Sequence, residues 1–96
     1  MKIIISPEAK QWFKEDMEAK SGEYIRFYAR YGGSSSLHEG FSLGVTKEQP
    51  LDLAIELVED DIHFYIEDRD IWYFDGHDLH VNVDPKRKEL TYSYEK

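Results

Sequence analysis

The chain has 96 residues, of which 41% are hydrophobic and 33% charged, and its 20 acidic and 12 basic side chains give a formal net charge of −8. This size and apolar content predict a single domain over residues 1–96. The acidic balance argues against nucleic acid and anionic membranes as partners, because both need a basic surface. Cysteine is absent, which excludes disulfides, thiolate nucleophiles and cysteine-ligated metal clusters.

The first ten residues, MKIIISPEAK, lack the features of a targeting segment. Their apolar run stops at Ser6 and Pro7, so it is too short for a signal peptide and far too short for a membrane span. We therefore expect a cytoplasmic protein. The β-branched residues of Lys2–Ile5 predict a short strand instead.

A helix is predicted directly after this strand. Ser6 suits the N-cap and Pro7 the first helical position, and Gly22 is a candidate C-terminal cap after a helix that reaches Lys20. Apolar residues recur at helical spacing, which predicts that one face of the helix packs on a sheet. Those residues are Ala9, Trp12, Phe13 and Met17.

From Glu23 to Tyr31 the sequence alternates as a strand does. One side carries Ile25, Phe27, Ala29 and Tyr31, and the other carries Tyr24, Arg26, Tyr28 and Arg30. The arginine and tyrosine side is either an anion- or partner-binding face or a solvated face. We expect the second, with guanidinium groups lying on the rings and pairing with nearby carboxylates.

The remaining chain predicts further short strands joined by turns. Strands are expected at Gly40–Thr46 and around residues 53–58, 62–67, 79–83 and 90–94. Between two of them, Asp68 can cap one helical turn whose Ile71, Trp72 and Phe74 bury together. One helix and about seven strands predict an α+β fold, mainly β, in which the strands curl or stack in two layers.

The segment from Arg30 to Val45, RYGGSSSLHEGFSLGV, is the least regular part of the sequence. It contains four of the six glycines and a run of three serines. Glycine permits positive φ and close backbone approach, so the segment is either a ligand-binding loop on a rigid sheet or a flexible hairpin loop without chemistry. The residues expected to form a binding loop are Arg30, Gly32, Gly33, Ser34, Ser35, Ser36 and Gly40.

Three residues are candidate ligands for a mononuclear metal. His38, Glu39 and His77 combine imidazole with carboxylate, a set that suits iron(II), manganese or zinc. They converge only if the turn near His77 bends toward the glycine segment, and scattered surface histidines are the alternative. The three serines, His38 and several Asp residues also supply the residue types of a hydrolytic triad. The strand–nucleophile–helix turn that such a serine requires is missing, so we expect no enzyme and no resident cofactor.

The order of several short segments resembles the HesB-like family, the A-type iron–sulfur carriers. The segments are ISPEA opening the helix, IRFYARYGG entering the glycine segment, GFSLGV leaving it, and WYFDG followed by DLHV. The family pattern in those places is a helix after ITxxA, a strand ending in Gly-Cys-Ser-Gly, and a strand entry after LDG. The resemblance implies a bent fold of two β-sheets with one N-terminal helix packed alongside.

The cluster ligands of that family are missing here. In the carriers the glycine loop supplies one cysteine and a later Cys-Gly-Cys supplies two, whereas this sequence has serines in the loop and ends at Lys96, about where that motif would begin. A serine hydroxyl keeps its proton near neutral pH and is a poor iron ligand. The sequence therefore resembles a cysteine-free branch of the family.

The resemblance implies a homodimer and protein partners in cluster assembly. We accordingly expect a non-enzymatic accessory protein of iron–sulfur cluster biogenesis that holds no cluster. The alternative is a general protein- or small-ligand-binding module outside that pathway. The expected contact surface is the glycine loop, with Arg26 and Arg30 leading to it and Trp72 and Tyr73 nearby.

Overall fold

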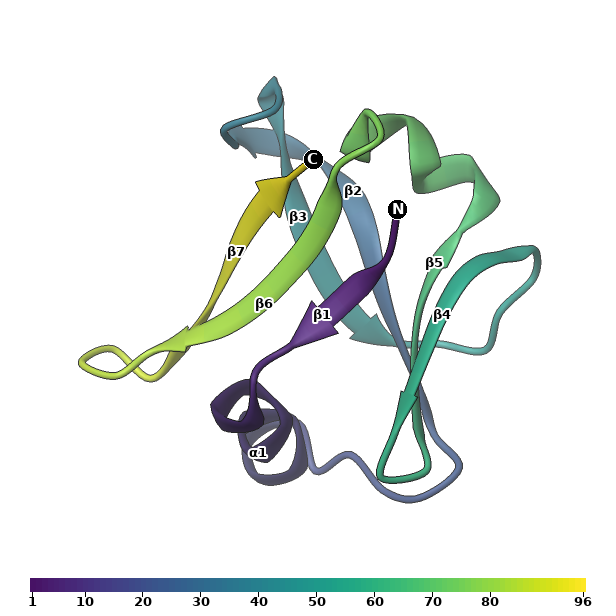
Figure 1. Ribbon diagram of the computed structural model, residues 1–96, viewed down its shortest axis with the longest axis vertical. Coiled ribbons are helices and arrows are strands. Elements are labelled where there is room, and N and C mark those ends of the chain that lie inside the picture. Colours follow the sequence, from purple (N-terminus) through teal and green to yellow (C-terminus); the bar gives the residue numbers. More distant parts are fainter.

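The chain folds into two small β-sheets with a helix at one end, as the computed structural model of residues 1–96 shows (Figure 1). The first sheet has the order β1-β6-β7, in which β1 is parallel to β6 and β7 is antiparallel to it. The second has the order β3-β2-β5-β4, with a parallel pair, β2 and β5, at its centre. The strands are β1 (Ile3–Ile5), β2 (Tyr24–Ser34), β3 (Glu39–Lys47), β4 (Leu53–Glu59), β5 (Ile62–Glu67), β6 (Asp78–Asp84) and β7 (Glu89–Glu95). The predicted α+β, mainly β fold class is confirmed.

The helix α1 (Pro7–Asp16) begins as its sequence indicates. The Ser6 side chain accepts a hydrogen bond from the Ala9 N–H at 3.1 Å, and Pro7 occupies the first helical position. The helix is shorter than expected. It ends at Asp16, and Glu18, not Gly22, takes the first left-handed conformation after it, with φ of 52°.

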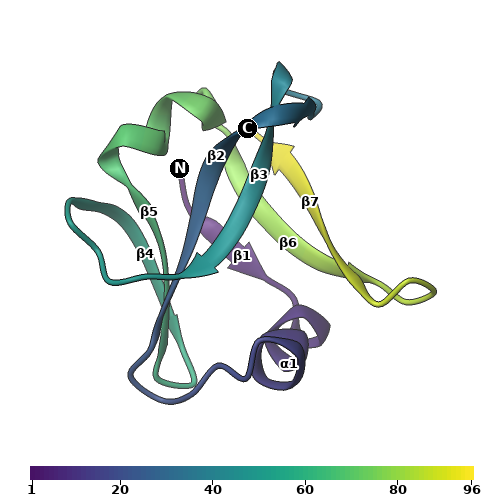
Figure 2. The same cartoon turned by 180° about the vertical axis from the view of Figure 1, so that it is seen from behind.

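The core lies between the two sheets and α1. Figure 2 shows the arrangement of these sheets and the helix from behind. The Phe13 ring of α1 meets those of Phe27 on β2 and Phe64 on β5, with centroid distances of 6.0 and 5.0 Å. Each such side chain contributes about 1.5–3 kcal/mol on full burial. The buried cluster consists of Ile3, Ile5, Ala9, Phe13, Ala19, Ile25, Phe27, Leu43, Ile62, Phe64, Ile66, Tyr73, Phe74, Leu79 and Val81.

The glycine segment is mostly regular strand. β2 runs on to Ser34 and β3 starts at Glu39, so only four residues connect them. The pairing shifts between Tyr31 and Ser34, where Gly32 and Gly33 take φ of 117° and 65°, which L side chains rarely adopt. The segment therefore forms a hairpin with a bulge near its tip.

The expected turn of helix after β5 is a 3₁₀ helix, η1 (Asp68–Phe74). Its N-cap is Glu67, and no side chain caps it, so the predicted capping role of Asp68 is wrong. Tyr73 and Phe74 are fully buried, whereas Trp72 is 49% exposed. Ile71 is partly buried and packs against the core, so the expected joint burial is correct for Ile71 and Phe74 and wrong for Trp72. Residues three apart share one side of a 3₁₀ helix, which places Ile71 and Phe74 together and Trp72 elsewhere.

Arg26 is buried, contrary to the expectation of a solvated arginine and tyrosine face. Its Nη2 lies 2.7 Å from Asp70 Oδ2 and its Nη1 lies 2.7 Å from Glu48 Oε2. The guanidinium also lies over the Tyr28 ring, 5.3 Å from the centroid. Burial disfavours the charge of Arg26, but the bonds to Asp70 and Glu48 outweigh it and raise its pKa. The pairing was predicted correctly, and its location inside the protein was not.

Glu67 is a second buried charge, only 1% exposed. Its two oxygens accept hydrogen bonds from the N–H groups of Leu51 and Asp52 at 2.7 and 2.6 Å, which fixes the connection between β3 and β4. Burial alone would raise the pKa of Glu67. The two backbone hydrogen bonds, with Arg26 and Arg69 nearby, outweigh burial and hold the pKa below its usual 4.5.

Replacing Glu67 by Gln should therefore destabilise the fold and weaken its dependence on acid. The amide has one acceptor oxygen and presents donors to the other N–H, so we expect a loss of about 1–3 kcal/mol in the free energy of unfolding near pH 7. In the unfolded chain the pKa of Glu67 has its usual value of 4.5, and in the folded protein the pKa is lower. The stabilisation that Glu67 contributes is therefore complete above about pH 4.5 and is lost as the pH falls through the lower pKa of the folded state.

Urea denaturation of the two proteins across this pH range measures the effect. Glu89→Gln removes the same charge from an exposed position at the start of β7 and is the matched control. Equal stability of Glu67→Gln, Glu89→Gln and the wild type at neutral pH would contradict the assigned role.

Candidate functional site

The tip of the β2–β3 hairpin and the 3₁₀ helix η1 meet at the end of the molecule opposite α1 (Figure 1). His38 lies in the four-residue connection, and its Nε2–H donates a hydrogen bond to the carbonyl of Tyr73 at 2.9 Å. This bond joins two segments that are 35 residues apart in the sequence. The glycine segment and Trp72–Tyr73 are thus neighbours, as expected.

Four rings at this end form a continuous surface, which we call the aromatic patch: Tyr31, His38, Phe41 and Trp72. The Phe41 ring lies edge-on to both Tyr31 and Trp72, with centroids 5.6 and 5.2 Å apart, and His38 packs on Trp72 at 5.2 Å. Tyr31 is 87% exposed and Trp72 49% exposed. Edge-to-face contacts favour this arrangement, yet much of the aromatic area faces solvent.

The aromatic patch is held in place by the buried ion pair of Arg26 with Asp70. β2 pairs with β5 only over Tyr24–Arg26. Beyond that point η1 takes the place of β5, and Asp70 Oδ1 accepts a hydrogen bond from the Ala29 N–H at 3.4 Å. Asp70 thus bonds both the side chain and the backbone of β2, and this sets the position of Trp72 two residues later.

A hydroxyl-lined groove of about 360 Å³, the serine groove, runs beside the hairpin. The groove is lined by Ser34, Ser35, Ser36, Ser42, Leu43, Tyr92 and Tyr94. Burial raises the pKa of Tyr92 to about 12, so its phenol keeps its proton at neutral pH. Arg30 is close, and its Nε and Nη2 donate to Ser42 Oγ at 3.3 and 3.2 Å. The groove therefore offers hydroxyl groups, with the guanidinium of Arg30 at its wall.

The residues expected to form a binding loop lie together at this end of the hairpin. Ser34–Ser36 line the serine groove and Arg30 bonds to its wall, while Gly32 and Gly33 form the bulge. Gly40 opens β3 with φ of 81°. That these residues bind anything stays a prediction.

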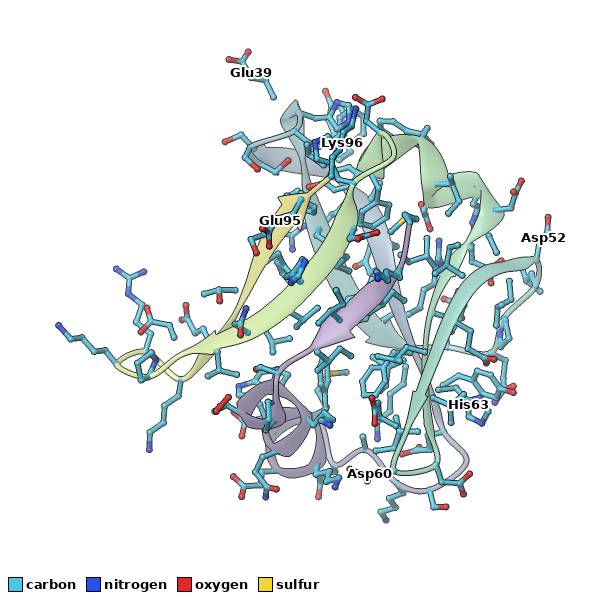
Figure 3. The ribbon with its side chains drawn as sticks, viewed as in Figure 1. Glu39, Asp52, Asp60, His63, Glu95 and Lys96 are labelled. Carbon is cyan, nitrogen blue, oxygen red and sulfur yellow. The ribbon has the colours of Figure 1, made fainter.

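The candidate metal ligands are not assembled into a site. Nδ1–H of His77 donates to the carbonyl of Phe74 at 2.9 Å, and His38 uses its Nε2–H on Tyr73. The Glu39 side chain extends from the hairpin away from the rest of the protein (Figure 3). No group of three or more His, Asp or Glu side chains is placed to hold a metal ion. The metal site proposed from sequence stays a prediction without a formed geometry to support it.

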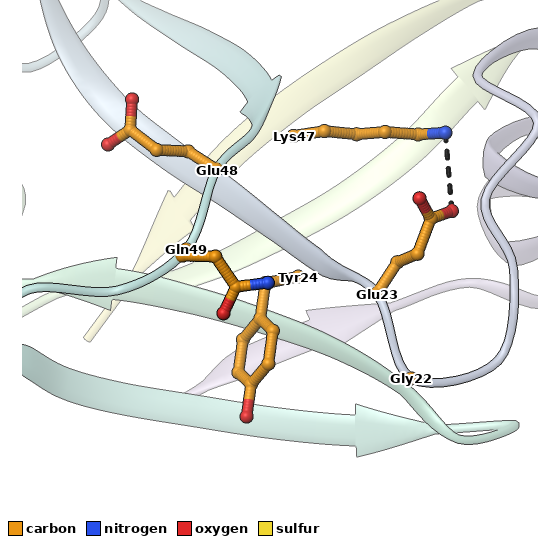
Figure 4. Close-up of a pocket in the computed structure, with 6 residues that line it drawn as sticks. All are labelled: Gly22, Glu23, Tyr24, Lys47, Glu48 and Gln49. Atoms are coloured by element: carbon orange, nitrogen blue, oxygen red, sulfur yellow. Dashed lines mark ion pairs between the residues drawn. The ribbon is translucent and has the colours of Figure 1, made fainter.

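A second depression, of about 310 Å³, lies between the start of β2 and the start of the β3–β4 connection (Figure 4). Its charged residues are already paired. Lys47 Nζ lies 3.2 Å from Glu23 Oε1, and Glu48 bonds Arg26. A hydrogen bond from the Lys20 N–H, together with Lys47, lowers the pKa of Glu23. With its charges satisfied internally, this depression is a weaker candidate than the aromatic patch.

Sequence reasoning missed two members of the aromatic patch, Tyr31 and Phe41. Alternation placed Tyr31 on the side of Ile25, Phe27 and Ala29, which predicts burial. Tyr31 does face that way, but the hairpin extends past the core there. Its position beside Gly32 and Gly33 was the available signal, since a strand that ends in a bulged hairpin carries its last side chains beyond the sheet it packs on.

The structure contains no helix with the length and apolar character needed to cross a membrane. Comparison with known proteins gives relatives along the whole chain. A Bacillus subtilis (strain 168) protein named pyruvate dehydrogenase inhibitor is 41% identical over 95 residues, which cover 99% of this chain and 100% of that protein. Uncharacterized proteins of Staphylococcus saprophyticus and Staphylococcus aureus (strain MRSA252) are each 34% identical over 97% of this chain and 98% of their own.

No family model matches the chain, and no solved structure matches it. The resemblance to the HesB-like family is therefore wrong, as are the expected place in iron–sulfur biogenesis and the cluster-assembly partners. The short segments that suggested it are compatible with many β folds, whereas the identity to the Bacillus subtilis protein is spread over the full length. That protein's name describes a regulator of another protein and makes no reference to iron–sulfur clusters.

The Asp70→Asn variant tests the link between the buried ion pair and the aromatic patch. The amide keeps the shape of the side chain but leaves the charge of Arg26 with only Glu48 as partner, so we expect a loss of about 1–3 kcal/mol in the free energy of unfolding. Since η1 is held on β2 by Asp70, the near-ultraviolet circular dichroism of the aromatic patch should weaken as well.

Asp68→Asn changes the same chemical group at an exposed position on the same 3₁₀ helix, and we expect it to alter stability by no more than about 0.5 kcal/mol. If the Asp70 and Asp68 variants behave alike in urea denaturation, the ion pair does not hold η1 in place.

Proposed function

This chain belongs to the family of the Bacillus subtilis pyruvate dehydrogenase inhibitor, and we propose that it too binds pyruvate dehydrogenase and lowers its activity. The observation that carries this proposal is the 41% identity over the full length of both proteins. An alignment of that extent includes the hairpin, η1 and the core that positions them, and not merely a shared fragment of the fold.

The surface of the protein supports binding to another protein. A typical stable interface buries about 800 Å² on each partner. The whole surface of this chain measures 5750 Å², so such an interface would cover roughly one seventh of it. Tyr31 and Trp72 already expose large aromatic side chains, the kinds that contribute most to binding energy at protein interfaces.

The proposed inhibition is stoichiometric and reversible. A regulatory role of this kind requires the chain only to occupy a surface of the enzyme and involves no chemical step on either protein. Inhibition should then saturate as the enzyme becomes fully bound, and dilution should restore the activity at the rate of dissociation.

The test is to add the purified chain to pyruvate dehydrogenase from the same organism. We expect the steady-state rate to fall along a saturable binding curve, and sedimentation velocity to show a complex of the chain with the enzyme. Interfaces of ordinary size give dissociation constants from micromolar downward, so a titration to about 10 µM covers the expected range.

A protein of similar size and charge from another family serves as the control for non-specific acidic effects. Full enzyme activity at the highest concentration of the chain, together with the absence of a complex in sedimentation, would exclude this function.

A further inference from the structure

We propose that the aromatic patch is the surface through which the chain docks on its enzyme, and that the enzyme meets it with an apolar pocket bordered by Lys or Arg side chains. This inference rests on the proposed function and specifies the residues that perform it. Tyr31 and Trp72 would enter the pocket, while Phe41 and His38 support them from behind.

The aromatic patch differs in kind from the rest of the exposed apolar surface. The other large exposed apolar residues are aliphatic: Ile4, Leu51, Leu53 and Val58. Single exposed aliphatic residues are normal on any protein, whereas contiguous exposed aromatic groups mark interaction sites. Trp and Tyr are also the residues most enriched among those whose truncation weakens binding strongly.

Hydrogen bonds, an ion pair and ring contacts position the aromatic patch before binding. The His38–Tyr73 hydrogen bond joins hairpin to helix, and the Arg26–Asp70 pair holds the helix on β2. Phe41 then packs between Tyr31 and Trp72. Because these side chains already occupy defined positions, little conformational freedom is lost on association, and more of the interaction energy appears as affinity.

Charge indicates the chemistry of the partner surface. Glu39 follows His38 and Asp75 follows η1, both are exposed, and neither carboxylate has a hydrogen bond or ion pair within the chain. Cations lie near the aromatic patch as well: Arg30 precedes Tyr31, Arg69 is exposed on η1, and Lys96 lies beside Gly76. The attraction to a basic surface therefore comes mainly from the net charge of the whole chain. The chain as a whole carries −8, so its field attracts a basic surface and repels an acidic one.

Trp72→Ala and Tyr31→Ser test the aromatic patch directly. Binding of each variant to immobilised pyruvate dehydrogenase from the same organism should weaken by about tenfold to a hundredfold, mainly through faster dissociation, with a parallel loss of inhibition. Tyr31 is 87% exposed, so its variant should fold normally even if Trp72→Ala perturbs η1. Urea denaturation of both variants verifies the fold.

Leu51→Ser is the matched control, since Leu51 is 84% exposed but lies in the β3–β4 connection outside the aromatic patch. It should bind and inhibit as the wild type does. If the wild type itself neither binds nor inhibits, the proposed function fails and this inference with it. If Tyr31→Ser, Trp72→Ala and Leu51→Ser all match a wild type that binds, the docking surface is wrong while the function stands.

A second experiment tests the charge of the partner. The double change Glu39→Lys and Asp75→Lys should slow association and flatten its dependence on salt concentration, because attraction to a basic surface is lost. Asp16→Lys, at the end of α1 on the opposite side of the molecule, should alter association less (Figure 1). If the double variant and the wild type associate at the same rate and with the same salt dependence, the enzyme's pocket has no basic border.

Sedimentation velocity of the chain alone tests whether a second copy of the chain, in place of the enzyme, covers the aromatic patch. If the wild type is a dimer and Tyr31→Ser is a monomer that still binds the enzyme normally, the aromatic patch joins two copies of the chain. That result would also overturn the inference.

Discussion

The ion pair between Arg26 and Asp70 is the contact on which the end of the protein that carries the aromatic patch depends. Its two side chains are only 9% and 8% exposed, so each would be costly to bury without the other. Asp70 also receives the Ala29 N–H, where β2 has lost β5 as a neighbour. A 3₁₀ helix with no side-chain cap is thereby fixed against a strand, and the orientation of Trp72 follows from it.

The β2–β3 hairpin supplies the other half of this surface, and glycines in its backbone determine its shape. A Cβ on Gly44 would come within 2.5 Å of the Tyr28 ring, so glycine there lets the ring lie across β3. The bulge at Gly32 and Gly33 then turns the last residues of β2. The sheet extends past the core as a two-stranded arm, which explains why Tyr31 has an inward register and an exposed ring.

The aromatic patch and the serine groove share the β2–β3 hairpin but differ in chemistry, since the patch continues onto η1 and the groove onto β7. The aromatic patch offers apolar rings with exposed carboxylates beside it, a combination suited to a protein surface. The serine groove offers neutral hydroxyl groups, among them the phenol of Tyr94, whose pKa burial raises and which lies 3.1 Å from the Tyr73 hydroxyl. The proposed binding to pyruvate dehydrogenase would use the aromatic patch in preference to the groove, because a protein target requires contact area more than a small cavity.

The sequence by itself determined the fold class, the Ser6–Pro7 helix start and most strands, because capping and alternation are local properties that neighbouring residues fix. It also indicated that Arg26 pairs with carboxylates and that the glycine hairpin lies near Trp72. Only the tertiary structure decided that Arg26 is buried, that Tyr31 is exposed and that Asp70, not Asp68, is the important acid of η1. Those outcomes depend on contacts between segments that are distant in the sequence, such as Arg26 and Asp70, which are 44 positions apart. No local pattern of residues encodes which distant segments meet.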